Sequence, residues 1–315
     1  IIMKKFLLTL FVLLSLLVFS ACKKQDEESI REVSVIMPTG TPALGLASYA
    51  NVASKDGSAK VEVVGGADLL KTAFINKSHD IIVAPVNLGA MMYNTYESYV
   101  LYKAFVWGNL YLVSKNTFES LNDLNGKTVV VFGQNSTPDI VFRAILASYT
   151  DLEIEIQYVD DVSSANTMLA SGKAEYIISA EPSLTKIKGK LGNVSVLDLQ
   201  EEWKRLSGSS SYPQAGIFVN KEVLEDKAVV KALEKMTESV KDAVKNPSKC
   251  AENAVELHES FATLTKEVLE ASIPNCHYDI LESDKEAVNF YLQKMIDLGF
   301  SKQVGGKLPS EGFFN

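Results

Sequence analysis

The sequence predicts an α/β protein made of two similar lobes, each built on a parallel sheet, that are joined by two chain crossings. Two observations carry this prediction: strand and helix patterns that occur twice in the same order, and strands that are apolar on both faces. The chain has 315 residues, of which 47% are hydrophobic and 22% charged. It is therefore long enough for two lobes and too apolar for a disordered protein.

The first 21 residues are typical of a secretory signal peptide. Lys4 and Lys5 precede a largely apolar run that ends at Phe19. This run is short for a membrane span, which needs about 20 apolar residues, although a marginal transmembrane anchor is the alternative. The ending Ser-Ala-Cys resembles a bacterial lipobox, so we expect cleavage before Cys22 and a lipid on its sulfur. Residues 22–30 are polar and predict a flexible tether to the outer face of a membrane.

The first half of the repeat is a strand, a turn and a helix. Residues 32–37 (EVSVIM) and 127–132 (KTVVVF) are strand patterns, and each is followed by a turn rich in small polar residues and then by an amphipathic pattern. Pro42 and Pro138 occupy the same place in the two copies. We expect each at the first helical position, with the preceding Thr as the N-cap.

The second half of the repeat is a helix that leads into a buried strand. Asp80 precedes IIVAP in the first copy, and Glu175 precedes YIISA in the second. Because strands joined by helices form right-handed crossovers, every strand-to-helix loop should lie along the carboxyl edge of its sheet. A ligand cleft is therefore expected where the two carboxyl edges face each other.

The remaining segments connect and complete the lobes. β-Rich segments around residues 100–114 join the copies, the segments SVLDL and 212–223 predict strands that lead back, and residues 224–298 have a helical pattern. Lobe 1 is predicted at 31–112 plus 216–315, and lobe 2 at 113–215. The two crossings are expected near Asn109 and near Tyr212 to Gln214.

The first turns of the two repeated helices are candidate ligand contacts. Their unpaired backbone N–H groups suit an acceptor-rich or anionic group of a ligand, and ordinary helix capping is the alternative. The candidate residues are Thr39, Gly40, Thr41 and Pro42 in the first copy and Gln134, Asn135, Ser136 and Thr137 in the second.

Strand ends and crossings supply the other candidates. Pro85 and Asn87 follow one buried strand, and Glu181 follows the other, where its carboxylate could accept from an amino group or cap the helix that starts at Pro182. Aromatic rings near the crossings could stack on a flat ligand. For Trp107, packing in the core is the stronger interpretation. The candidates at the crossings are Trp107, Asn109, Tyr111 and a lid residue, Tyr212.

Composition excludes several classes of partner. The formal net charge of −8 argues against nucleic acid, and the presence of only three Arg residues argues against a strongly charged ligand. The three His residues lack metal-ligand spacing with the cysteines, so we expect neither a metal nor a cofactor. Cys250 and Cys276 form either a disulfide or two free, partly buried thiols.

Several stretches together resemble the type II periplasmic binding proteins that serve ABC importers. They are VSVIMPTGTPALGLA, ADLLKTAFINKSHDIIVAPVNLGAMM, LNDLNGKTV and ASGKAEYIISAEPSLTKI, and they look most like the branch that binds thiamine-precursor pyrimidines, sulfonates or nitrate. The resemblance implies a monomer that captures a small molecule between its lobes and delivers it to an ABC permease and ATPase complex. With few Arg residues, we favour a neutral or weakly charged ligand, such as an aminopyrimidine.

Two other functions stay open at this stage. A ligand-sensing lipoprotein that signals to a membrane receptor would have the same sequence features. The fold also occurs in enzymes, among them menaquinone-pathway dehydratases. The expected signal peptide and the lack of a visible nucleophile–His–acid set argue against an enzyme.

Overall fold

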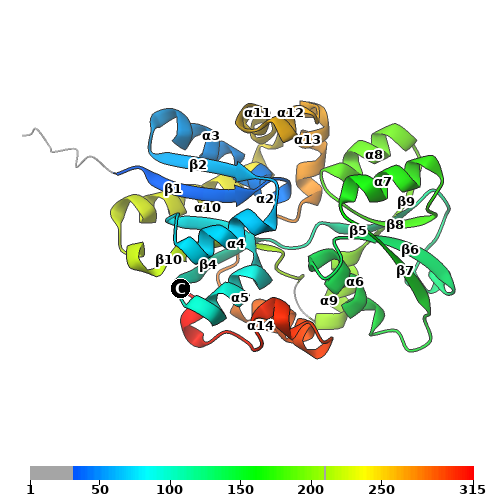
Figure 1. Ribbon diagram of the computed structural model, residues 1–315. Helices are drawn as coiled ribbons and strands as arrows, with labels where there is room; N and C mark the ends of the chain where they lie inside the picture. Colours follow the sequence, from blue (N-terminus) through cyan, green and yellow to red (C-terminus); the bar gives the residue numbers. More distant parts are fainter. Residues whose placement is uncertain (1–30, 209–210) are drawn as a thin grey trace, which may run out of the picture. The chain divides into compact units, whose positions relative to one another are not determined.

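The computed structural model describes residues 31–208 and 211–315, and two five-stranded sheets form the centres of two lobes (Figure 1). The first sheet has the strand order β2-β1-β3-β10-β4. Its strands, in that order, are Ala59–Val64, Val33–Pro38, Ile81–Pro85, Ala215–Asn220 and Tyr99–Val106. The second sheet has the order β7-β6-β8-β5-β9. Its strands are Ile154–Val159, Lys127–Phe132, Tyr176–Ala180, Leu110–Ser114 and Ser195–Asp198.

The predicted repeat is present, with one more strand in each copy than the sequence patterns indicated. β2 and β7 each pair in parallel with the first strand of their copy. Both lie at a sheet edge, and exposed and less exposed residues alternate along them. Because only one face of an edge strand is covered, these segments lack the continuous apolar run that marks β3 and β8.

The sheets are mixed: the strands of the repeat run parallel, as predicted, and one strand that enters from the other lobe runs antiparallel to them in each sheet. β1, β2 and β3 run parallel, whereas β10 pairs antiparallel with both β3 and β4. In the second sheet, β5 pairs antiparallel with β8 and β9. The reason is the crossing: β5 and β10 each enter their sheet directly from the other lobe, so they run against the strands of the repeat.

The first crossing includes Asn109, near which it was expected, although the predicted lobe boundary lies a few residues later. β4 belongs to the first sheet and β5 to the second, so the chain changes lobe over residues 107–109. The predicted boundary after residue 112 falls inside β5. The return crossing follows α9 (Leu199–Ser207) and precedes β10, in the region where Tyr212 to Gln214 were expected to cross.

Helices cover both faces of the sheets. In the first lobe they include α2 to α5, and in the second α6 to α9; α10 to α14 follow β10, in the region predicted to be helical. The bounds not given elsewhere are α2 (Thr41–Gly45), α3 (Ala47–Asp56), α4 (Ala67–Asn76), α5 (Val86–Tyr96), α6 (Thr137–Leu146), α7 (Val162–Ser171), α8 (Ser183–Leu191), α10 (Lys227–Lys245), α11 (Pro247–Leu257), α12 (Glu259–Ala262), α13 (Lys266–Ser272) and α14 (Lys285–Asp297), with short 3-10 turns η1 (Leu121–Leu124), η2 (Lys221–Val223), η3 (Ile273–Asn275), η4 (Ser301–Val304) and η5 (Glu311–Phe313).

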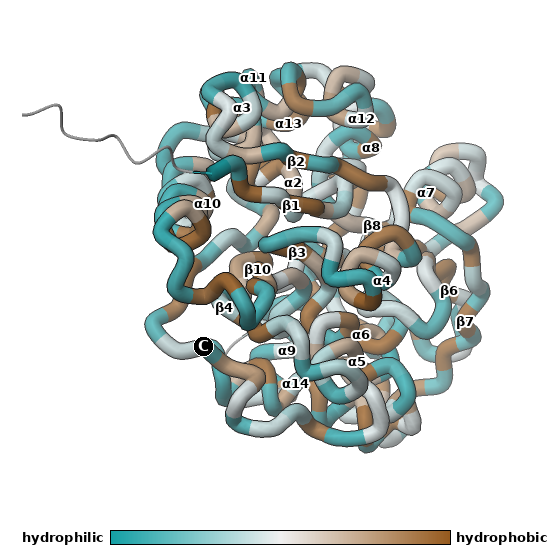
Figure 2. The backbone as a smooth tube through the Cα atoms, turned by 60° about the vertical axis from the view of Figure 1, so that its left-hand side comes forward, coloured by the Kyte–Doolittle hydropathy of each residue, from teal (hydrophilic) through white to brown (hydrophobic). Residues whose placement is uncertain are grey.

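Apolar residues on alternate positions of the central strands β1 and β3 face different cores. Along β1, Val33 and Val35 join the cluster under α2, α3, α10 and α11, whereas Ile36 joins a second cluster with α4 and α5. Figure 2 shows the hydrophobic colouring in parts of β1 and β4 and hydrophilic colouring at the outer turns of α11. Burial on both faces explains why the central strands read as continuous apolar runs.

The C-terminal helix α14 contacts both lobes, although residues 216–315 were predicted within lobe 1. Figure 1 shows it between α5 and α9. Tyr291 of α14 packs against Trp203 of α9, with ring centroids 5.8 Å apart, and its hydroxyl lies 3.3 Å from Thr137 Oγ1 at the start of α6. The second apolar cluster therefore runs without a break from β3 and α5 through α14 to α6 and α9.

Some sequence predictions fall outside the described residues. The signal peptide at 1–21, the lipidated Cys22 and the tether at 22–30 are among them. Within residues 31–208 and 211–315, no helix is long and apolar enough to cross a membrane. Of the two thiol alternatives, the structure has two free and buried cysteines, Cys250 and Cys276.

Candidate functional site

The carboxyl edges of the two sheets meet through a buried polar contact between the lobes. Thr41, the first residue of α2, donates its hydroxyl to the backbone oxygen of Glu181 over 2.9 Å. Asn109, at the first crossing, donates its Nδ2 to the Thr41 hydroxyl and lies 3.5 Å from the same Glu181 oxygen. One residue from each lobe and one from the crossing therefore share a single hydrogen-bonded junction.

Thr41 is not the N-cap that the sequence pattern predicted. The N-caps are Gly40 for α2 and Ser136 for α6, and neither helix has a side-chain cap hydrogen bond. Thr41 and Thr137 each begin their helix, so their hydroxyls are available to groups outside it. Each contacts a distant element: Thr41 reaches Glu181, and Thr137 lies beside the Tyr291 hydroxyl.

Asn109 is buried in this junction, and only its side-chain nitrogen is used there. The residue is 2% exposed and has a φ of 98°, a left-handed conformation that Asn tolerates better than most residues. Its Oδ1 is buried and has no hydrogen-bond partner among the described residues. An unpaired buried amide oxygen costs about 1–3 kcal/mol. Asn109 Oδ1 is therefore a buried acceptor that the described residues leave unused.

Of the two alternatives for Glu181, the structure has the helix-capping contact, and the contact with a ligand stays a prediction. Its carboxylate accepts from Thr185 N (3.0 Å) and Thr185 Oγ1 (2.9 Å) in the first turn of α8, which is a helix-capping role. It also lies 3.5 Å from the Nδ2 of Asn275, which the other lobe contributes. Burial raises the pKa of Glu181, and the hydrogen bonds from Thr185 oppose that shift.

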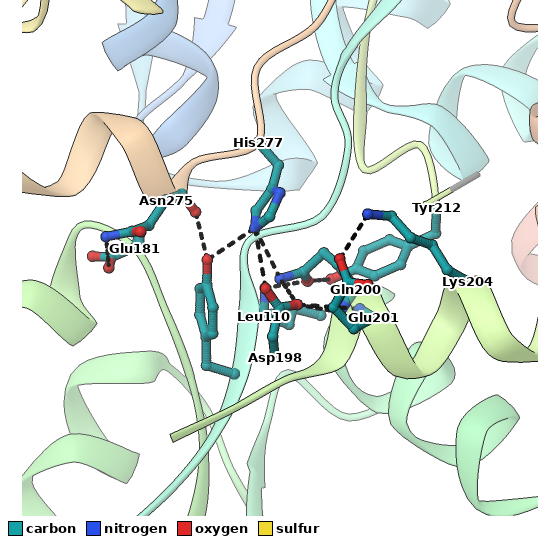
Figure 3. A network of polar contacts seen from close by, with 10 residues as sticks. Leu110, Glu181, Asp198, Gln200, Glu201, Lys204, Tyr212, Asn275 and His277 are labelled. Atoms are coloured by element: carbon teal, nitrogen blue, oxygen red, sulfur yellow. Dashed lines mark hydrogen bonds and ion pairs between the residues drawn. The ribbon is translucent and has the colours of Figure 1, made fainter. Parts of the chain in front are cut away.

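A second part of the network centres on His277, which follows η3 (Figure 3). The Tyr111 hydroxyl of β5 donates to Asn275 O over 2.7 Å and lies 3.0 Å from His277 Nε2. Asp198, at the end of β9, lies 3.6 Å from the same nitrogen. Burial lowers the pKa of His277, whereas the charge of Asp198 raises it. The C-terminal segment is thus tied to the second lobe by polar groups.

Gln200 of α9 connects the two crossings. Its Oε1 accepts from Leu110 N (2.8 Å) and from the Tyr212 hydroxyl (2.6 Å), and its Nε2 donates to Asp198 (2.8 Å). At Gly108, φ is 121° and a Cβ would lie 2.1 Å from the Gln200 side chain. Only glycine therefore allows the first crossing to pass this close to α9.

The predicted aromatic contacts are mostly core residues. Trp107 is 5% exposed and donates its Nε1 to Asp279 O over 3.2 Å. Tyr212 is completely buried and packs against both Trp203 and Tyr291, so it is a core residue and does not cover the cleft as a lid. Trp107 also lines a cavity of about 300 Å³ beside the crossings, together with His277 and Ser211, whose Oγ is buried without a partner among the described residues.

The other predicted contacts differ in exposure. Gln134, Asn135 and Ser136 are exposed, and Asn135 N donates to the buried Asp139 carboxylate over 2.8 Å. Asn87 is half-buried in the first turn of α5, and its Oδ1 has no partner within the described part of the chain. Half-buried residues at the remaining predicted positions are Thr39, Gly40, Pro42 and Pro85.

Sequence reasoning missed the contribution of the C-terminal segment and of α9. Asn275 and His277 lie in a region whose sequence shows only a helical pattern, and nothing there points to a cleft. Asp198 and Gln200 could have been found, because Asp198 lies near the end of the predicted strand SVLDL and Gln200 directly follows it, much as Glu181 follows YIISA. In the described residues, no group of three or more His, Cys, Asp or Glu side chains could hold a metal ion.

The fold is that of the type II periplasmic binding proteins. An ABC transporter structure from Parabacteroides distasonis has a TM-score of 0.74 and 22% identity, covering 90% of this chain and 98% of that one. The periplasmic aliphatic sulphonate binding protein SsuA from Escherichia coli has a TM-score of 0.69 and 15% identity, covering 89% and 90%. The periplasmic nitrate-binding protein NrtA from Synechocystis PCC 6803 has a TM-score of 0.61 and 13% identity, covering 86% and 82%.

The chain belongs to the protein family described as menaquinone biosynthesis, whose model matches residues 70–296. The matched range runs from α4 to α14 and includes Asn109, Glu181 and His277. No curated protein matches the sequence.

Proposed function

We propose that this protein is a lipid-anchored solute-binding protein on the outer face of a membrane. It captures a small molecule between its lobes and delivers that molecule to an ABC importer. The observation that carries the proposal is the junction of Thr41, Asn109 and Glu181, in which a buried amide oxygen has no partner among residues 31–208 and 211–315. The fold shared with solute-binding proteins and the signal-peptide pattern of residues 1–21 support it.

Opening of the lobes would turn this junction into a binding surface. Lobes joined by two short crossings move by changing backbone angles at the crossings, here near Asn109 and near Tyr212 to Gln214. When they separate, the Thr41 hydroxyl and the Glu181 backbone oxygen lose each other as partners. A ligand that carries both donors and acceptors would replace those contacts and, by bonding to both lobes, would favour their closure.

The chemistry of the junction favours a neutral or weakly charged ligand. The Glu181 carboxyl, with its raised pKa, can accept from an amino group without a full ion pair. Arg143, the Arg of α6, is engaged by Asp139 (2.9 Å) and by the Tyr158 hydroxyl (2.7 Å). The rings of Tyr111 and Trp107 lie beside the same crossing. We therefore propose a heteroaromatic ligand, with an aminopyrimidine as the first compound to test.

Ligand screening tests this proposal. Purified protein is heated with aminopyrimidines, alkanesulfonates or nitrate, and any small molecule that co-purifies is identified by native mass spectrometry. A ligand at 100 times its Kd adds about 2.7 kcal/mol of stability, which is a shift of several degrees in Tm. We expect an aminopyrimidine to give this shift in the wild type and in the Glu153→Gln control, but not in Glu181→Gln. The absence of stabilisation by every heteroaromatic compound would refute the proposed ligand class.

An enzymatic role in menaquinone biosynthesis is the second candidate, and membership of the family favours it. Glu181 is buried and His277 half-buried, and both are titratable and close to the same crossing, so they would be the first acid–base groups to examine. Deletion of the gene distinguishes the two functions. A lost menaquinone pool that wild-type protein restores would favour the enzyme, whereas normal menaquinone with reduced solute uptake would favour transport.

A further inference from the structure

A second cavity lies between the lobes, separate from the junction of Thr41, Asn109 and Glu181. Its volume is about 350 Å³, which is within the range of small-molecule sites. One wall is formed by α7 and α8 of the second lobe, and the other by residues 260–264, which follow α11. Phe261 in that segment belongs to the apolar core of the first lobe, so the two walls move with different lobes.

The charge of this cavity is opposite to that of the protein. Lys186 and Lys190 both line it, and their spacing of four residues places them on the same face of α8. No Asp or Glu is among its lining residues. Neither lysine forms an ion pair with any residue that the structure describes. In a chain with a formal charge of −8, two uncompensated ammonium groups in one cavity form a local site for an anion.

Hydroxyl groups from both walls add neutral donors. Thr167 of α7 lines the second-lobe wall, and Ser260 and Thr263 line the first-lobe wall. The Thr263 hydroxyl donates to Ser260 O (2.9 Å), and Ser260 Oγ lies 2.8 Å from His258 Nδ1. Because a hydroxyl has one proton, Thr263 donates to a phosphate oxygen only after its hydroxyl turns away from Ser260 O. Hydroxyls and ammonium groups together are typical partners of phosphate oxygens.

The cavity also has an apolar part. Ile187 and Leu264 line it from opposite walls, between the polar groups. A free inorganic ion would leave this surface in contact with water. A ligand that carries a phosphate group on a small apolar body would cover it, and burial of that surface would add to its affinity.

We propose that this cavity binds a small organic phosphate, with Lys186 and Lys190 holding the phosphate group and Thr263 contacting it from the first lobe. Because the two walls belong to different lobes, the bound molecule stabilises their closed arrangement. This site is independent of the ligand proposed for the junction, and either proposal can fail without the other.

Isothermal titration calorimetry of the full chain tests the site. The probes are inorganic phosphate and phenyl phosphate, titrated at constant ionic strength. We expect both to bind saturably and phenyl phosphate to bind more tightly, because its ring covers the apolar part. The Lys186→Gln/Lys190→Gln double variant should weaken phenyl phosphate binding by about tenfold or more, which corresponds to the loss of at least one charge-assisted hydrogen bond.

Two further variants distinguish binding of the phosphate in the cavity from general electrostatic attraction of an anion to the basic helix α8. Lys188→Gln removes the same charge from the same helix at a position outside the cavity lining, so it should change the Kd by less than about twofold. Thr263→Val keeps the shape of the first-lobe wall but removes its hydroxyl, and should weaken binding. Absence of saturable binding, or equal weakening by Lys186→Gln and Lys188→Gln, would overturn the site. An unchanged Kd in Thr263→Val would overturn the bridging contact.

Discussion

Gly89, in the helix that carries Asn87, should not tolerate even one added methyl group. It faces Phe218 of β10, and a Cβ at position 89 would lie 2.0 Å from Cζ and 2.1 Å from Cε1 of that ring. Carbon atoms in contact are normally about 3.5–4.0 Å apart. Phe218 cannot easily move aside, because it is completely buried and its ring packs against Phe74 at 5.7 Å and Phe313 at 6.1 Å.

The magnitude follows from two opposing effects of Gly89→Ala. Alanine in a helix is favoured over glycine by about 1 kcal/mol, whereas overpacking of a core costs about 1–3 kcal/mol and occasionally more. The overlap at position 89 places the overpacking cost at the upper end of that range. We therefore expect Gly89→Ala to lower the free energy of unfolding by about 2 kcal/mol.

Gly189 provides the matched control. It also lies inside a helix, α8, but a Cβ there would meet nothing within 4 Å. Gly189→Ala should therefore raise the free energy of unfolding by about 0.5–1 kcal/mol through helix propensity alone. Both variants are measured by urea unfolding followed by circular dichroism. If Gly89→Ala were as stable as the wild type, the close packing of α5 on β10 would be wrong.

Two other predictions concern buried titratable groups. Because the folded-state pKa of Glu181 is raised, its contribution to stability is present at acid pH and is lost as the pH rises through that pKa. Glu181→Gln should therefore be more stable than the wild type at pH 8, and this gain in stability should disappear towards pH 4. A gain that does not change with pH would contradict the raised pKa. Burial raises the pKa of Cys250 to about 12, and Cys276 is equally buried. In a Cys22→Ser protein, Ellman's reagent should therefore label no thiol in the folded state and two thiols after unfolding. No labelling after unfolding would indicate a disulfide between Cys250 and Cys276.

Local patterns were sufficient for the repeated part of the fold. The apolar runs at IIVAP and YIISA predicted β3 and β8 with the bounds that the structure has. These strands are buried on both faces, so their sequence carries the signal without reference to neighbours. The edge strands β2 and β7 were missed, because half of their residues face solvent and their alternation is weak evidence alone.

Some residues of the candidate site could likewise be predicted from local patterns, and others could not. Thr41, Asn109 and Glu181 could be selected from the sequence, because they follow strands or mark a change of lobe, and such positions lie at the carboxyl edge of a sheet. Asn275 and His277 could not be selected, because they lie in a segment that is distant along the chain and has no strand to mark its place. Their contacts depend on how the C-terminal helices pack against the second lobe.

Local sequence patterns were enough to predict the two-lobed α/β plan, the position of the crossings to within a few residues, and the strand ends at which the lobes meet. These features follow from periodicity and burial, which act over short stretches of chain. The antiparallel fourth strand of each sheet, the contact of α14 with both lobes and the hydrogen bond from Thr41 to Glu181 could be known only from the folded structure. Each of these depends on residues far apart in the sequence, and their contact is fixed by the packing of whole elements.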